Sequence, residues 1–123
     1  MSERIKKLQQ LKALAHLIRT AEEAKLAEAR FAEKAVQDKI VSLREDRKTE
    51  CAAAPDPRNA YALEAWLGWS SAQIEAEQAR QARQRAQVEM RLSDFKKAFG
   101  RASAIDELLE RERRADKQKR SRT

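Results

Sequence analysis

The sequence predicts an all-α fold: a long antiparallel two-helix coiled-coil hairpin with a C-terminal helical extension. Two glycines and two prolines in 123 residues are too few for the turns of a multi-stranded sheet. Charged residues make up 38% of the chain and aromatic residues 5%, which leaves little for a thick globular core. The length allows one domain, which we expect to span residues 1–123.

The first helix is expected over about residues 3–50. This stretch lacks glycine and proline and is rich in Ala, Leu, Glu, Lys, Arg and Gln, the strongest helix formers. Its apolar residues alternate at spacings of about three and four, as in a coiled-coil seam, although Glu22 interrupts the pattern. The expected seam residues are Leu8, Leu11, Ala15, Ile18, Leu26, Ala29, Ala32 or Glu33, Val36, Ile40 and Leu43.

The turn is expected over about residues 51–56, because both prolines lie in the segment CAAAPDPRNA. Pro55 cannot lie inside a helix, whereas Asp56 followed by Pro57 is typical of an N-cap and a first helical residue. The second helix is therefore expected over about residues 57–115. Its expected seam residues are Leu63, Leu67, Ile74, Val88, Leu92, Phe95, Phe99, Ala102, Ile105 and Leu109.

A connection this short makes the two helices antiparallel neighbours. Folding the chain near residue 54 would set large side chains against large ones and alanine-rich stretches against each other. The expected neighbours are His16 with Leu92, Ile5 with Ile105, and Trp66 and Trp69 with Ile40 and Leu43.

The C-terminal residues are strongly basic. The last eleven, RRADKQKRSRT, contain six Lys+Arg and one Asp, a net charge of +5 out of +7 for the whole chain. Helix one has ended before it can face them, so we expect the tail 116–123 to fray. The tail either keeps the protein soluble or binds an acidic protein surface or nucleic acid.

Catalytic and metal-binding motifs are missing from the sequence. It has one histidine and one cysteine, and no Cys-x-x-Cys, His-Glu-x-x-His or glycine-rich phosphate loop. We expect no enzymatic activity, no cofactor and no metal, with His16 a partly buried structural residue and Cys51 an exposed thiol. Because no signal peptide or membrane span is evident, we expect a cytoplasmic protein.

Two aromatic groups are candidates for binding or for core packing. Tyr61, Trp66 and Trp69 are three of the six aromatic residues and lie close to the predicted turn. They either thicken the core there or form a partner-binding patch. Phe95 and Phe99 face the leucines of helix one in the expected pairing, which favours core packing.

Nucleic-acid binding is the less favoured interpretation of the basic composition. The isoelectric point is about 9.9, but acids and bases alternate along both helices. Residues 1–50 carry a net +3 and residues 51–100 a net +1. No uniform basic stripe follows from this pattern, and no basic and aromatic residues interleave to stack bases.

Taken with the helical pattern, three segments give the chain a family resemblance. They are IKKLQQLKALAHL leading into AEEAKLAEAR, then YALEAWLGW, and RLSDFKKAFGRASAIDELLERERRADKQKR. The chain resembles the FliJ and YscO family, the central stalk proteins of flagellar and type III secretion export. A generic coiled-coil adaptor or scaffold is the alternative.

The resemblance implies a non-enzymatic stalk that binds inside a hexameric export ATPase and links it to the export gate protein. It also implies possible binding of export chaperones, a location at the cytoplasmic side of the inner membrane, and a monomer when isolated. Residues implied at the gate end are Tyr61, Trp66 and Trp69. Residues implied at the ATPase end are Leu92, Phe95, Phe99, Ile105, Leu108, Arg111, Arg113 and Arg114.

Overall fold

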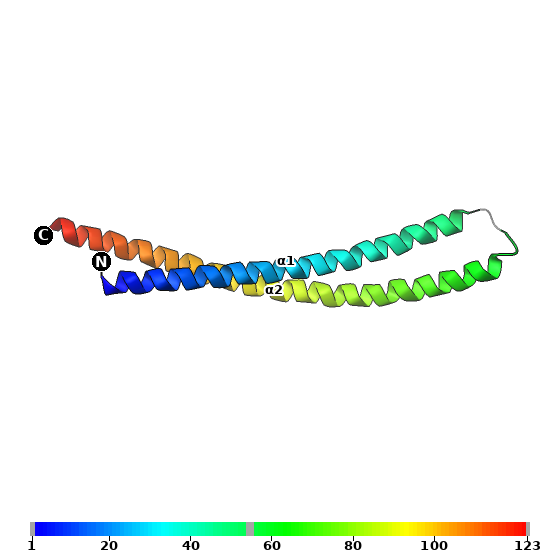
Figure 1. Cartoon of the computed structure of the whole chain (residues 1–123), viewed down its shortest axis with the longest axis horizontal. Coiled ribbons are helices and arrows are strands. Elements are labelled where there is room, and N and C mark those ends of the chain that lie inside the picture. Colours follow the sequence, from blue (N-terminus) through cyan, green and yellow to red (C-terminus); the bar gives the residue numbers. More distant parts are fainter. Residues whose placement is uncertain (1, 54–55, 123) are drawn as a thin grey trace. The chain divides into compact units, whose positions relative to one another are not determined.

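The protein consists of two helices packed against each other in opposite directions (Figure 1). The computed structural model describes residues 2–53 and 56–122. Helix α1 spans Glu3–Ala52 and α2 spans Ala60–Arg122, and the described residues include no strand. The prediction of an all-α helical hairpin is confirmed.

Helix α1 begins with a side-chain cap. The Ser2 hydroxyl accepts the Ile5 N–H at 3.2 Å, and the Ser2 carbonyl accepts the Lys6 N–H at 3.2 Å. This is the arrangement of an N-cap residue, which satisfies amides that the first helical turn leaves free. In the sequence, Ser2 lies three residues before Ile5, the first apolar residue of the helix, and this spacing is typical of an N-cap.

Helix α2 begins three residues later than predicted. Asp56 Oδ1 accepts the Arg58 N–H at 3.0 Å, which forms a local turn instead of a helix cap. The first helical bond runs from the Leu63 N–H to the Asn59 carbonyl at 2.8 Å, so Asn59 takes the N-cap position. Asp56 and Pro57 therefore precede the helix, and α1 ends at Ala52. Pro55 lies outside the described residues.

The C-terminal residues are helical as far as Arg122, so the prediction of a frayed tail is wrong over 116–122. The Asp116 carboxylate pairs with Arg120 one turn later at 3.2 Å. Lys119, Arg120 and Arg122 occupy the last turn, where cations interact favourably with the helix dipole. Thr123 lies outside the described residues.

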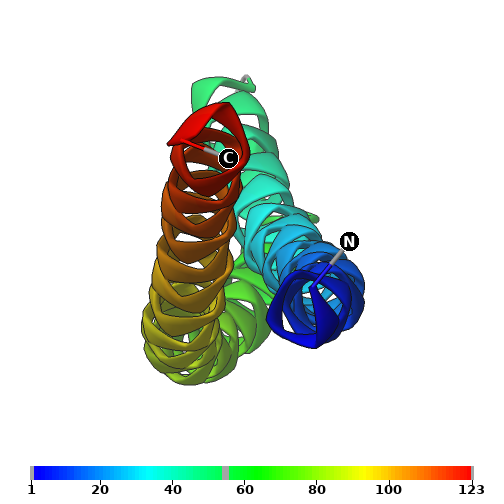
Figure 2. The ribbon, with the colours of Figure 1, turned by 90° about the vertical axis from the view of Figure 1, so that its left-hand side faces the viewer.

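Internal contacts divide the hairpin into two compact units. The terminal unit combines residues 1–27 with 89–123, and the connecting unit comprises residues 28–88. In Figure 2 the terminal unit faces the viewer, with its α1 segment in blue and its α2 segment in yellow to red. Each unit contains one segment from each helix, so each has its own helix pair.

The buried residues of α1 fall in two series, each with a spacing of seven residues: Ala15, Ala29 and Val36 belong to one, and Ile5, Leu26 and Ile40 to the other. The positions between the buried residues of the second series are half-buried polar residues. Leu11 and Ile18, which the sequence placed in the seam, are instead 49% and 45% exposed. That placement is wrong because the neighbouring residues Lys12 and Arg19 occupy the seam instead. The series that begins at Ile5 consists of Ile5, Lys12, Arg19, Leu26, Glu33, Ile40 and Arg47.

Each α1 residue meets α2 further along the chain than predicted. In the terminal unit, Arg4 pairs with Glu112 at 3.2 Å, and His16 lies against Asp106 instead of Leu92. Ile5 is therefore not the neighbour of Ile105. The late start of α2 moves the fold point, and alanine-rich stretches in both helices allow the changed register.

The connecting unit shows the same displacement. Lys39 Nζ lies 3.1 Å from Glu77, and Arg47 Nη1 donates to the Ser70 hydroxyl at 2.7 Å. The predicted pairing of the two tryptophans with Ile40 and Leu43 is therefore wrong, since that stretch of α1 faces residues beyond Ser70.

Candidate protein-binding surface

The terminal unit carries the entire net charge of the protein. Its two segments contain 17 Lys+Arg and 10 Asp+Glu, a net of +7. The connecting unit contains 10 of each and is neutral. Five of the seven excess charges lie in the last eleven residues, and the contacts between the helices show which segment of α1 shares a unit with them.

The eight residues implied at the ATPase end all belong to the terminal unit. Leu92, Phe95 and Ile105 are half-buried along the helix contact, whereas Phe99 and Leu108 are exposed. The structure thus brings these residues into one unit but divides them between its interior and its surface. Only the exposed members are available to a partner without rearrangement.

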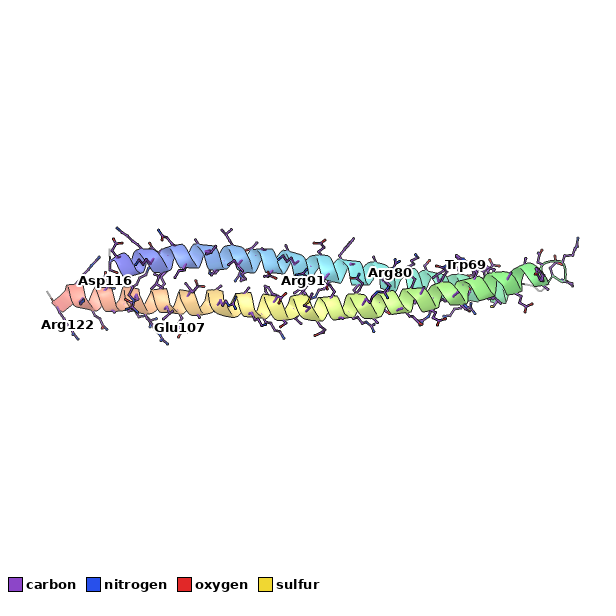
Figure 3. The ribbon with its side chains drawn as sticks, turned by 90° about the horizontal axis from the view of Figure 1, so that it is seen from below. Trp69, Arg80, Arg91, Glu107, Asp116 and Arg122 are labelled. Atoms are coloured by element: carbon purple, nitrogen blue, oxygen red, sulfur yellow. The ribbon has the colours of Figure 1, made fainter. Side chains whose placement is uncertain are left out.

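The three arginines of this group lie on the exposed side of α2. Arg111 Nη2 lies 2.7 Å from Glu107, and Arg114 Nη2 lies 2.6 Å from Glu110. Figure 3 shows Glu107 pointing away from α1. Pairs of this kind, one helical turn apart and exposed, contribute a few tenths of a kcal/mol at most. Arg111, Arg113 and Arg114 therefore remain accessible to an acidic partner.

Phe95 and Phe99 form a contact of their own within the terminal unit. Their ring centroids are 6.0 Å apart with an angle of 47° between the planes. The guanidinium carbon of Arg19 lies 5.7 Å from the Phe99 ring centroid, a cation–π geometry. Phe99 therefore lies under the Arg19 guanidinium and is 48% exposed, instead of entering the core that the sequence predicted for it.

The residues implied at the gate end lie in the connecting unit. Tyr61 is 86% and Trp69 54% exposed, while Trp66 is half-buried. Among the described residues no ring contact joins the three. The sequence left open whether these residues thicken the core or form a partner-binding patch. Core packing applies to Trp66, whereas the rings of Tyr61 and Trp69 face solvent and are free to bind a partner.

A histidine–carboxylate pair joins the helices of the terminal unit. His16 Nε2 lies 2.9 Å from Oδ1 and 3.0 Å from Oδ2 of Asp106, and Lys12 Nζ lies 3.8 Å from the same carboxylate. The hydrogen bond with His16, together with the positive charges of His16, Lys12 and Arg19, lowers the pKa of Asp106 below its usual 3.8. Sequence reasoning missed this pair because it used the wrong register.

Replacing Asp106 with asparagine should lower the urea midpoint at pH 7, because the asparagine amide cannot supply the negative charge. The lowered pKa of Asp106 means that its stabilising contribution is present above about pH 3.8 and is lost as pH falls through the lower folded-state value. Wild type and Asp106→Asn should therefore converge as the pH falls well below 3.8, through the lowered pKa of Asp106. Glu107→Gln, which breaks an exposed pair on the same helix, is the control and should change little. A difference that persists undiminished at low pH would contradict the role of the charge.

An apolar groove runs between the two helices of the terminal unit. It forms a hollow of about 150 Å³. The apolar pattern did not predict the groove, because it placed Leu11 and Ile18 in the seam, whereas both line the groove. The lining residues are Leu11, Leu14, Ala15, Ile18, Ala98, Arg101 and Ile105.

The connecting unit contains an open, basic hollow. Arg44, Arg47 and Lys48 line it together with Ser71 and Cys51, whose thiol is free and exposed. Arg47 is already engaged, because its Nη1 donates to the Leu67 carbonyl and to two serine hydroxyls at 2.7–2.8 Å. Its guanidinium thus joins α1 to α2 here.

Two further features are absent from residues 2–53 and 56–122. Neither helix contains an apolar stretch of the length that crosses a bilayer. In the same ranges, no three side chains of His, Cys, Asp or Glu gather in an arrangement that could hold a metal ion.

Comparison with protein-family models, with curated proteins and with solved structures finds no match to this chain.

Proposed function

We propose that the protein is a non-enzymatic central stalk of a type III export apparatus, flagellar or virulence. In this proposal the terminal unit binds inside a hexameric export ATPase, and the connecting unit contacts the export gate protein. The observation that carries the proposal is the concentration of the whole +7 charge in the unit that holds both chain ends. The resemblance of the three sequence segments to the FliJ and YscO family supplies the identity of the partners.

Charge and exposure support an ATPase partner for the terminal unit. A strongly positive surface is attracted to an acidic lumen and raises the rate of encounter. Beyond Glu112, which pairs with Arg4 of α1, the basic side chains of the described residues are all exposed. Many weak contacts of this kind suit a ring whose subunits change conformation during turnover.

Exposed aromatic side chains support a separate contact for the connecting unit. Tyr61 and Trp69 present large rings to solvent on a neutral background. Such rings are favoured anchors of protein interfaces. The gate protein is the partner that the family resemblance implies for this unit, and export chaperones are further candidates.

The proposal predicts that adding the purified protein increases the activity and the hexamer content of the export ATPase. A chain truncated after Glu112 keeps the Arg4 pair but loses a net +5, so it should stimulate at least about tenfold less at low salt. ATP hydrolysis and sedimentation of the ATPase would measure both effects. The control replaces Arg44 and Lys48 of the connecting unit with glutamate and should stimulate normally. No stimulation by the full chain would refute the stalk role.

A coiled-coil adaptor is the second candidate, favoured by the exposed apolar residues of the terminal unit. An adaptor of this kind would form a stable four-helix dimer that buries those side chains. Sedimentation equilibrium separates the candidates, since the stalk is expected to be a monomer.

A further inference from the structure

One face of α1 in the terminal unit exposes large apolar side chains that the hairpin does not cover. Leu11, Leu14 and Ile18 are 49%, 55% and 45% exposed. They are spaced by three and four residues, so they lie along one face of the helix. A contiguous apolar stripe in such a charged protein marks an interaction surface.

The opposite wall of the groove comes from α2. Ile105 supplies an apolar side chain, and the buried Ala98 and Ala15 leave room between the helices. Small residues at the base of a groove let another helix approach closely and insert a side chain. The hollow of about 150 Å³ is concave, which suits such an inserted side chain better than the flat boundary of a lipid surface.

The rim of the groove is basic. Arg101 lines it, and Lys7 lies one turn before Leu11 on the same face of α1. Within the described ranges, the structure records no ion pair for either side chain. The unit around them has a net charge of +7, so two copies meeting face to face would repel each other. The charge therefore disfavours a second copy of this chain and favours an acidic partner.

We propose that this groove binds one amphipathic helix of a partner protein, with the apolar stripe of that helix flanked by Asp and Glu. The apolar side chains would insert between α1 and α2, and Arg101 and Lys7 would pair with the flanking carboxylates. This is the helix-in-groove mode of recognition. The site does not depend on the ATPase proposal, because the groove and its charge define the ligand.

The test uses the full chain and synthetic peptides. The probe is a helical peptide of about 18 residues, or five turns, with leucines at spacings of three and four and glutamates beside them. A second peptide keeps the leucines and replaces every glutamate with lysine. We expect the glutamate peptide to bind at least about tenfold more tightly than the lysine peptide in titration calorimetry.

Matched variants locate the site. Leu14→Glu should weaken binding of the glutamate peptide at least about tenfold. Leu17→Glu is the control, because Leu17 is exposed on the same helix but does not line the groove. Arg101→Glu should reverse the preference between the two peptides. Circular dichroism checks folding, and Leu14→Ser replaces Leu14→Glu if the charge unfolds the unit.

Several outcomes would overturn the proposal. They are equal binding of both peptides, no binding of either, or equal effects of the Leu14 and Leu17 variants. Binding to anionic phosphatidylglycerol vesicles without peptide binding would make the groove a lipid site. Self-association that Leu14→Glu abolishes would make a second copy the occupant. Stimulation of the ATPase is measured separately, so the two proposals can fail independently.

Discussion

Replacing Leu109 with alanine should lower the free energy of unfolding of the terminal unit by about 2–5 kcal/mol. Leu109 is 1% exposed, and it lies one turn before the Glu112 pair with Arg4. Besides Leu109, the buried apolar residues larger than alanine among the described residues of this unit are Ile5 and Leu26. Because a two-helix unit has no second layer to close the cavity, the loss should be near the upper end of that range.

Hydrogen exchange is the appropriate measurement, because it resolves the amides of each unit separately. Leu109→Ala should speed exchange across residues 1–27 and 89–122 and leave the connecting unit less affected. The matched control is Leu108→Ala, one residue away and 46% exposed, which should cost under about 1 kcal/mol. Equal losses from the two variants would show that Leu109 is not a core residue in solution.

The fold was predictable because helix propensity and the two prolines act locally. Two segments without proline formed helices, although α2 includes Gly68 and Gly100, and the proline-containing segment separated them. The end of the turn was not predictable to the residue, since Asp56 and Asn59 are both good N-cap residues. The hydrogen bonds from the Arg58 N–H to Asp56 and from the Leu63 N–H to Asn59 distinguish them.

The spacing of apolar residues alone did not predict which residues of the two helices face each other, and it did not predict the groove. Leu11 and Ile18 fit an alternating spacing of three and four residues, and their neighbours Lys12 and Arg19 fit a regular spacing of seven residues equally well. Because leucine and isoleucine are hydrophobic, the sequence pattern favoured them as the seam residues. The structure favours the lysine and arginine because their long apolar stems can pack at the seam, where the Arg19 guanidinium lies over the Phe99 ring. The same error hid both the groove and the His16 pair with Asp106.

Replacing Glu77 with leucine should stabilise the connecting unit by about 1–4 kcal/mol. The Glu77 side chain is buried between the helices, and its Oε1 lies 3.1 Å from Lys39 and 3.7 Å from Arg80. Its Oε2 is buried without a hydrogen-bond partner in the structure. Burying a carboxylate with one oxygen unsatisfied is costly, whereas leucine at this position would add apolar contact.

The partners of Glu77 make this substitution favourable. The Lys39 and Arg80 side chains are each 55% exposed, so removing the carboxylate leaves both cations in contact with water. No buried charge is therefore created, unlike the removal of one partner from a fully buried pair. The gain should appear as a higher urea midpoint.

Tryptophan fluorescence can measure this effect, because Trp66 and Trp69, the two tryptophans of the chain, both belong to the connecting unit. Glu75→Leu is the control. Glu75 is exposed and lies two residues away, so its replacement should change the free energy of unfolding by under about 0.5 kcal/mol. A lower midpoint for Glu77→Leu would mean that the pairs with Lys39 and Arg80 outweigh the burial of the carboxylate. A higher one would mean that the polar seam weakens a helix pair that an apolar residue could hold more firmly.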